Sequence, residues 1–128
     1  MQTSFAADAM LDPEHLQFRD AFRGFVLEKL MAPALRGERA REFPMEVYDL
    51  LRAAGHLAPD HPEALGGGGG DILTGCIYYE ELSRIPAGVS AGVFAHQHLA
   101  IKPVLDVGTG AQIDAYARPV LPYLSDIP

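Results

Sequence analysis

The sequence predicts an all-α domain, a bundle-like arrangement of four to five helices. Apolar residues recur every three to four positions in successive segments, which is the spacing of one helix face. Asp12, Asp71 and Thr109 stand before such segments as good N-caps, and Gly55 and Gly108 suit helix ends. The chain has 128 residues, 48% of them hydrophobic, so it can bury a core of its own as one domain.

The first helix is predicted to begin at Asp12, which is followed by a proline and an acid. Its apolar stripe consists of Leu16, Phe18, Phe22, Phe25, Val26 and Leu30. We expect it to stop before Pro33, because a proline inside a helix removes a hydrogen bond. Gly24, which costs about 1 kcal/mol relative to alanine, suggests a close crossing with another helix. Residues 1–11 are expected to be a flexible N-terminus, and the charged run 36–42 a solvated connection.

A second, short helix is predicted to open at Phe43-Pro44 and to end at Gly55. Val47, Leu50, Leu51 and Ala54 form its apolar side. The loop that follows contains three residues of metal-binding type, namely His56, Asp60 and His61. There is no fourth ligand, and Pro59 and Pro62 explain the segment as turn formers, so we predict no metal site.

Five consecutive glycines, residues 66–70, cannot hold a helix or a strand and predict a flexible connecting loop. A glycine-rich loop before a helix also suggests a phosphate cradle. The dinucleotide pattern fails because its sixth position falls on Asp71 or on later residues that are not glycine. The P-loop pattern fails because Cys76 and Ile77 stand where lysine and serine or threonine belong. A carboxylate at the helix start would moreover repel a phosphate.

The next helix is predicted from Asp71 to about Arg84, with an apolar stripe of Ile72, Leu73, Cys76, Ile77 and Leu82. Cys76 on this stripe is expected to be a small buried residue. Glu80 and Glu81 are adjacent, so they point about 100° apart and cannot act together on one group. We predict no catalytic residue here.

From Ala87 to Val107 the chain is apolar nearly all round, which predicts a helix buried on most sides. His96 and His98 are two positions apart and so lie on opposite sides of it, each expected to be separately hydrogen-bonded. Pro103 should kink or unwind the helix locally. A last helix follows the Thr109 to Gln112 capping box, with one side formed by Ile113, Tyr116 and Val120.

Composition limits the possible partners. Ten basic against seventeen acidic residues give a net charge of −7, which argues against nucleic acid or an anionic membrane surface. The single cysteine excludes an internal disulfide framework. No apolar run approaches the length of a membrane span, and the first ten residues lack the pattern of a signal or transit peptide. We therefore expect a cytoplasmic protein.

Four stretches in order carry a family resemblance: PEALGGGGGD, YEELSR, AHQHLAIKPVLDVGT and AQIDAY. At these spacings, from Leu11 to Leu121, the chain resembles the N-terminal helical domain of the acyl-CoA dehydrogenases. The resemblance implies FAD-dependent α,β-dehydrogenation of acyl-CoA thioesters in fatty acid metabolism, with this domain shaping the acyl pocket. It places Ala91, Ala95, His96 and Leu99 on or next to the pocket-lining face. Small residues at Ala91 and Ala95 would leave room for a longer or branched acyl group.

The resemblance covers only part of such an enzyme. Residues 12–124 correspond to the helical domain and 125–128 to a tail, whereas the middle β-barrel and the C-terminal helical domain are absent. These parts hold most FAD contacts and the catalytic glutamate in the family, so we expect this chain alone to be inactive and to bind no FAD. A complete enzyme would be a homo-oligomer. One alternative is a non-enzymatic helical module, either a truncated remnant or a subunit completing another chain. Another, weaker because the negative charge does not attract the polyanionic CoA, is an independent small-ligand or acyl-CoA-binding domain.

Overall fold

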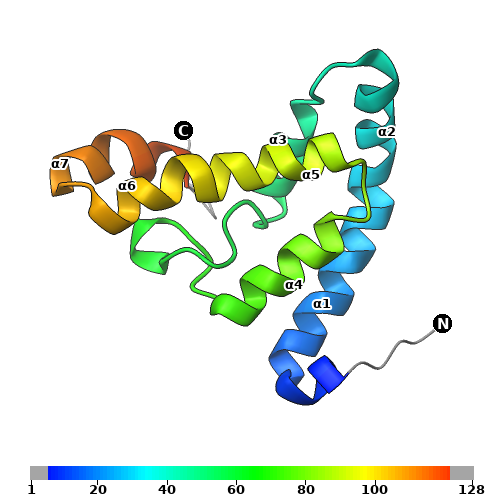
Figure 1. The fold of residues 1–128 in the computed structure, drawn as a ribbon, viewed down its shortest axis with the longest axis horizontal. Coiled ribbons are helices and arrows are strands. Elements are labelled where there is room, and N and C mark those ends of the chain that lie inside the picture. The colour runs from blue at the N-terminus through cyan, green and yellow to red at the C-terminus, as the bar shows by residue number, and fades with distance from the viewer. Residues whose placement is uncertain (1–5, 122–128) are drawn as a thin grey trace.

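A computed structural model describes residues 6–121 and shows helices throughout that range, with no strand among the described residues (Figure 1). Several helices continue directly into one another, so that the segments within residues 6–121 form five rods and two short, separate 3-10 helices, η1 and η3. In order, their segments are η1 (Ala6–Met10), α1 (Pro13–Phe25), η2 (Val26–Leu30), α2 (Met31–Ala40), α3 (Glu46–Ala53), η3 (Glu63–Leu65), α4 (Ile72–Leu82), α5 (Ala87–Phe94), η4 (Ala95–Ile101), α6 (Lys102–Val107), α7 (Gly110–Gln112), η5 (Ile113–Ala117) and η6 (Arg118–Val120). The all-α prediction is confirmed.

The first rod runs from α1 through η2 into α2 without a break, so the predicted stop before Pro33 is wrong. The segment η2 is π-helical, and Pro33 falls in the first turn of the α-helix that restarts at Met31. The wider π-helical turn directly before this position accommodates the proline, which has no amide to donate, within a continuous helix. The charged run 36–42, predicted as a connection, is therefore mostly helix and ends at Arg41 in the left-handed conformation (φ 57°).

The beginning of this rod is built as predicted, with one addition. Asp12 caps α1, and its own amide donates to the imidazole of His15, completing a capping box. Ordered structure starts before Asp12, because η1 is helical and Asp8 pairs with Arg19 at 2.8 Å. The close crossing predicted at Gly24 is wrong: a Cβ there would meet nothing within 4 Å.

The main core lies between the first rod, α3, α4 and α5. Its buried members are Phe22, Val26, Leu30, Ala34, Val47, Leu51, Leu57, Tyr78, Leu82, Ile85, Val89 and Val93. The Phe22 ring stacks on Tyr78 with centroids 4.6 Å apart, which joins α1 to the α4 helix alongside it in Figure 1. The helix predicted from Phe43-Pro44 is α3, and Gly55 follows it with φ 71°.

Helix α4 starts at the predicted cap, where the carboxylate of Asp71 accepts from the Thr74 amide at 2.9 Å. Its buried face matches the predicted stripe only in part, at Ile77 and Leu82. Ile72 is 82% exposed and Cys76 is also exposed, whereas Tyr78 and Glu81 are fully buried. The prediction of a buried Cys76 is wrong. Helix α4 packs on α1 with the neighbouring face, which contains Ile77, Tyr78 and Glu81, and this leaves Cys76 outside the contact.

The rod α5–η4–α6 is apolar nearly all round, but it is not buried on most sides as predicted. One stripe at four-residue spacing is buried, namely Val89, Val93, Gln97 and Ile101. The opposite side is open, with Leu99 66% and Val107 86% exposed. The local unwinding predicted at Pro103 is confirmed, since the π-helical segment η4 directly precedes it.

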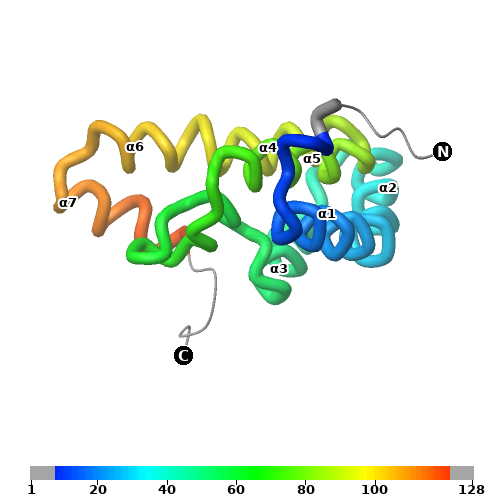
Figure 2. The backbone as a smooth tube through the Cα atoms, turned by 90° about the horizontal axis from the view of Figure 1, so that it is seen from below, coloured from blue at the N-terminus to red at the C-terminus, as the bar shows by residue number. Residues whose placement is uncertain are grey.

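The last rod, α7–η5–η6, turns back beside α6 at one end of the molecule (Figure 2). Its capping box at Thr109 is confirmed. The apolar side predicted for this last helix, which included Tyr116, is partly wrong. Tyr116 is 64% exposed, and the fully buried residues are Ala117 and Leu121. These two pack with Ala58 and Ile101 in a second, smaller core. The predicted boundary at 124 and the tail 125–128 lie outside the described residues. No described helix is both long and apolar enough to cross a membrane.

His15 joins the N-termini of two helices and predicts a pH effect. Its Nε2 lies 2.9 Å from a carboxylate oxygen of Asp71, the α4 cap, and its Nδ1 lies at the α1 cap, Asp12. The hydrogen bond to Asp71 raises the pKa of His15 above 6.5. A raised folded-state pKa means that this stabilisation is present below pH 6.5 and is lost as pH rises through the folded pKa.

We therefore expect the urea midpoint of the wild-type chain to fall as pH rises above 6.5. The variant His15→Phe should lack this dependence because it keeps the ring but has no titrating nitrogen. An NMR titration of His15 measures its pKa directly. A His15 pKa at or below 6.5, with equal slopes for both proteins, would contradict the assignment.

Candidate functional site

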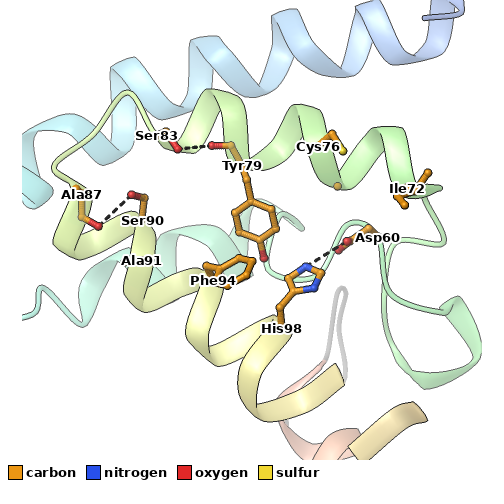
Figure 3. A pocket seen from close by; sticks show the side chains of 11 residues that line it. Asp60, Ile72, Cys76, Tyr79, Ser83, Ala87, Ser90, Ala91, Phe94 and His98 are labelled. Carbon is orange, nitrogen blue, oxygen red and sulfur yellow. Dashed lines mark hydrogen bonds and ion pairs between the residues drawn. The ribbon is translucent and has the colours of Figure 1, made fainter. Parts of the chain in front are cut away.

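A cavity of about 550 Å³ opens between α4 and the α5–η4 rod (Figure 3). Its lining residues are Asp60, Ile72, Gly75, Cys76, Tyr79, Ser83, Ala87, Ser90, Ala91, Phe94 and His98. The cavity forms because the α5 residues that face α4 are small, so the two helices do not close on each other. Figure 3 shows the small residues Ala87, Ser90 and Ala91 toward one end and Asp60 with His98 toward the other.

Most of the cavity surface is apolar. The Ser83 hydroxyl donates to the Tyr79 carbonyl at 2.6 Å, and the Ser90 hydroxyl donates to the Ala87 carbonyl at 3.2 Å. Because both hydroxyls are already bonded within their own helices, they offer little to a ligand. The cavity therefore suits a hydrocarbon group of moderate size.

Three rings form the middle of the wall. Phe94 stacks on His98 with centroids 5.3 Å apart, and Tyr79 meets both rings edge-on at 5.2 and 5.1 Å. The Tyr79 hydroxyl donates to the side-chain oxygen of Gln97 at 2.7 Å. Burial raises the pKa of Tyr79, so its phenol stays protonated and neutral. The rings thus form a fixed, uncharged wall.

A polar corner, formed by Asp60 and His98 with His61 behind them, interrupts the apolar surface. Asp60 lies 3.1 Å from Nδ1 of His61 and 3.4 Å from Nε2 of His98. Burial raises the pKa of Asp60, but the hydrogen bond with His61 and the nearby imidazoles outweigh it, and the net pKa is lowered. Burial lowers the pKa of His98. At neutral pH the corner therefore holds an ionised carboxylate beside a neutral imidazole.

Gln97 is the buried residue that fixes the cavity walls relative to one another. It is 1% exposed. Its side-chain nitrogen donates to the Leu57 carbonyl, and its side-chain oxygen accepts from the Tyr79 hydroxyl. Its backbone carbonyl lies 3.3 Å from Nε2 of His61. It thus links η4 to α4 and to the loop that carries Asp60. The sequence offered one signal for it, a polar residue at four-residue spacing between Val93 and Ile101.

The four residues that the family resemblance placed at the acyl pocket lie in different surroundings. Ala91 lines the cavity, whereas Ala95, His96 and Leu99 are not among its lining residues. The His96 ring lies 5.3 Å from that of Tyr48 on α3, and Leu99 is exposed. His96 and His98 thus lie on different sides of the rod, as predicted, but the hydrogen bonds expected for them are not found: Nδ1 of His96 and Nε2 of His98 are buried without a hydrogen-bond partner among the described residues. Sequence reasoning did not assign Asp60, Tyr79, Phe94 or His98 to this cavity.

The glycine loop is packed rather than a flexible connector, which corrects the prediction. All five amides donate to carbonyls of residues 58–63: Gly66 to Glu63, Gly67 to Pro62, Gly68 to Ala58, Gly69 to His61 and Gly70 to Pro59, at 2.8 to 3.0 Å. Amides that already have acceptors cannot cradle a phosphate. The loop instead holds Asp60 and His61 against α4 and η4.

The residues of metal-binding type are not brought together as one set. His56 packs on the rings of Phe22 and Phe25, whereas His61 and Asp60 contact each other and His98. Within residues 6–121, no group of three or more His, Cys, Asp or Glu side chains has the geometry to hold a metal ion.

The fold and the cavity define an all-helical domain with a mainly apolar, open pocket between two helices. The family description "Acyl-CoA dehydrogenase, N-terminal domain" matches residues 12–122. The chain therefore belongs to the acyl-CoA dehydrogenase family, whose N-terminal domain it represents.

Several relatives of known name match most of the chain. Caffeyl-CoA reductase-Etf complex subunit CarC of Acetobacterium woodii is 31% identical over 109 residues, 84% of this chain and 29% of the relative. Isovaleryl-CoA dehydrogenase, mitochondrial, of Arabidopsis thaliana is 30% identical over 116 residues, 89% of this chain and 28% of the relative. Short-chain specific acyl-CoA dehydrogenase, mitochondrial, of Homo sapiens is 30% identical over 109 residues, which are 85% of this chain and 26% of the relative. The chain thus spans less than a third of the length of each of these relatives.

The family generally uses FAD, and the described residues can be tested for a fit to it. The diphosphate of FAD needs free amides or basic side chains. The glycine-loop amides are all bonded, the α4 N-terminus carries the carboxylate of Asp71, and the cavity lining contains no lysine or arginine. Neither the glycine loop nor the cavity therefore fits the FAD diphosphate.

Proposed function

We propose that this chain is the N-terminal part of an FAD-dependent acyl-CoA dehydrogenase, and that its cavity forms one wall of the acyl pocket. The observation that carries this proposal is the open apolar cavity between α4 and α5–η4, which has Ala91 in its wall. An acyl chain is held by apolar area removed from water rather than by hydrogen bonds. The cavity has that character over most of its surface.

The same proposal includes what the chain lacks. Because neither the glycine loop nor the cavity fits the flavin diphosphate, we assign the FAD contacts to a barrel and a C-terminal helical domain, either of the same enzyme or of a partner subunit, and we place the catalytic base there too. The chain alone is then inactive. Ile72 and Phe94 both line the cavity, and their exposed side chains support a covering partner on this face. A homo-oligomeric assembly and a cytoplasmic location are further parts of the proposal.

Cys76 allows a direct test, because it is the only cysteine of the sequence, is exposed and lines the cavity. We expect octanoyl-CoA to slow alkylation of Cys76 by iodoacetamide in a saturable manner. CoA alone should not do so, because the thioester chain and not the nucleotide fills the cavity. Protection should increase from butanoyl to octanoyl thioesters, since Ala91 leaves the pocket open. A strict preference for the shortest chain would contradict this expectation.

Two variants make the test specific to the cavity. Ala91→Phe should fill the pocket and weaken protection by octanoyl-CoA about tenfold or more, because a phenyl ring takes the space of the acyl chain. Ala100→Phe is the matched control, since Ala100 is an exposed residue of the same rod and lies outside the lining. Equal protection in both variants would contradict an acyl site in this cavity.

A further inference from the structure

The polar corner of the cavity has a place and a chemistry that a purely hydrocarbon ligand does not use. Asp60 and His98 lie toward one end of the trough, while the small residues Ala87 and Ser90 lie toward the other (Figure 3). An acyl thioester lying along the cavity, with its thioester group at the end lined by the small residues, would bring the distal end of its acyl chain to this corner. The following inference rests on the proposed function, because it concerns which acyl group the pocket takes.

The Asp60 carboxylate has unused capacity to accept hydrogen bonds. Its side chain is only 12% exposed, and one oxygen is paired with His61 at 3.1 Å. Among the described residues, the polar atom that the other oxygen faces is Nε2 of His98, at 3.4 Å, which is longer than the usual range for such a bond. An ionised carboxylate can accept about four hydrogen bonds, so Asp60 can accept a further hydrogen bond from a donor group of a ligand.

The position of the carboxylate depends on a glycine in the facing helix. A Cβ at Gly75 of α4 would lie 2.6 Å from an Asp60 side-chain oxygen. The bare backbone at this position thus admits the carboxylate to the cavity edge. The amides of the five glycines donate to carbonyls of residues 58–63, the loop that carries Asp60. These bonds hold the Asp60 side chain in a fixed position at the cavity edge.

We propose that the Asp60–His98 corner binds a hydrogen-bond donor at the far end of the acyl group. The cavity then takes acyl thioesters with a distal hydroxyl in preference to their plain hydrocarbon counterparts, and it disfavours dicarboxylic ones. A hydroxyl can donate to the free carboxylate oxygen, whereas a terminal carboxylate meets a like charge. The ring wall of Tyr79 and Phe94 lies just before the corner and contacts the apolar part of the same ligand.

The test uses the whole chain and the alkylation of Cys76 as its readout. Matched ligands are hexanoyl-CoA, ω-hydroxyhexanoyl-CoA and adipoyl-CoA, with butanoyl and octanoyl pairs to vary the reach. We expect the ω-hydroxy member of the best-fitting pair to reach half-protection at about tenfold lower concentration than its hydrocarbon counterpart, as a bond to a charged acceptor provides. Adipoyl-CoA should protect least.

Variants separate recognition from a structural role. Asp60→Asn should remove the difference in protection between the ω-hydroxy and the hydrocarbon member of each pair, and it should improve adipoyl-CoA relative to hexanoyl-CoA. Asp114→Asn, which removes the same charge from an exposed site on η5, should change nothing. If Asp60→Asn loses its helical circular dichroism, His98→Phe, which keeps a ring in the wall, replaces it, and the wild-type ligand comparison stands by itself.

The outcomes distinguish the two proposals. Protection by hexanoyl-CoA with no gain from the hydroxyl at any chain length would overturn the inference and leave the acyl pocket in place. Absence of protection by every thioester would overturn the acyl pocket and the inference with it. A hydroxyl preference that survives in both Asp60→Asn and His98→Phe would also overturn the inference, because the donor would then bind elsewhere.

Discussion

The substitution Gly67→Ala should remove about 3 kcal/mol of folding free energy, which is a large part of the stability of a small domain. A Cβ at this position would lie 2.2 Å from the carbonyl oxygen of His61 and 2.4 Å from its carbonyl carbon. Backbone atoms cannot swing aside as a flexible side chain can, so the loop would have to open. Opening breaks the bond from the Gly67 amide to Pro62 and displaces Asp60 from the cavity.

Urea unfolding followed by circular dichroism measures this loss. The matched control is Gly24→Ala, where the added Cβ meets nothing within 4 Å in the middle of a helix. That variant should gain up to about 1 kcal/mol from helix propensity. If Gly67→Ala were as stable as the wild-type chain, the packed description of the glycine loop would be wrong.

The substitution Glu81→Gln should cost about 2 kcal/mol at neutral pH, because it removes the charge from a fully buried carboxylate that two arginines bind. Arg23 donates to both oxygens of Glu81, at 2.9 and 2.6 Å, and joins α1 to α4. Arg84 contacts the same carboxylate. Both guanidinium groups remain partly exposed and can regain water, which keeps the cost below that of a wholly buried pair.

The pH dependence of the loss identifies its origin. Burial raises the pKa of Glu81, but the bonds from the two arginines outweigh it, and the net pKa lies below the ordinary 4.5. A lowered folded-state pKa gives stability that is present above pH 4.5 and lost as pH falls through the folded pKa. The difference between wild type and Glu81→Gln should therefore shrink in acid. Glu80→Gln, at the exposed neighbouring position, should show neither effect; an equal loss in both variants would contradict the assignment.

Local signals predicted the helix starts well. Asp12, Asp71 and Thr109 all cap helices in the structure, because a cap depends only on residues within one turn. The end predicted at Pro33 failed for a non-local reason. Packing of Leu30 and Ala34 into the main core keeps the chain helical across the proline, and a π-helical turn absorbs the misfit.

Burial of particular faces was less predictable than the helices themselves. Cys76 and Tyr116 are hydrophobic and correctly spaced, yet both are exposed, because the packing angle of each helix selects which neighbouring face meets the core. The apolar α5–η4–α6 rod shows the same ambiguity. Its composition cannot tell a helix buried by its own domain from one that leaves a face open for a ligand or a partner.

The candidate site was the hardest part to predict from sequence. Asp60, Tyr79 and His98 come from three separate segments, and only tertiary packing brings them to one cavity. Sequence reasoning considered Asp60 with His56 and His61, its neighbours along the chain. In the structure Asp60 does contact His61, but it also faces His98, thirty-eight positions away, at the space left by Gly75.

The most direct test of the central claim is an amide NMR titration of the labelled chain with octanoyl-CoA. If the cavity is the acyl wall, resonances of Cys76, Tyr79, Ala91 and His98 should shift together and saturate, while those of the glycine loop stay nearly fixed and CoA alone leaves the cavity unchanged. Shifts confined to the glycine loop and the start of α4, with none at Ala91 or His98, would contradict the account and place thioester binding elsewhere.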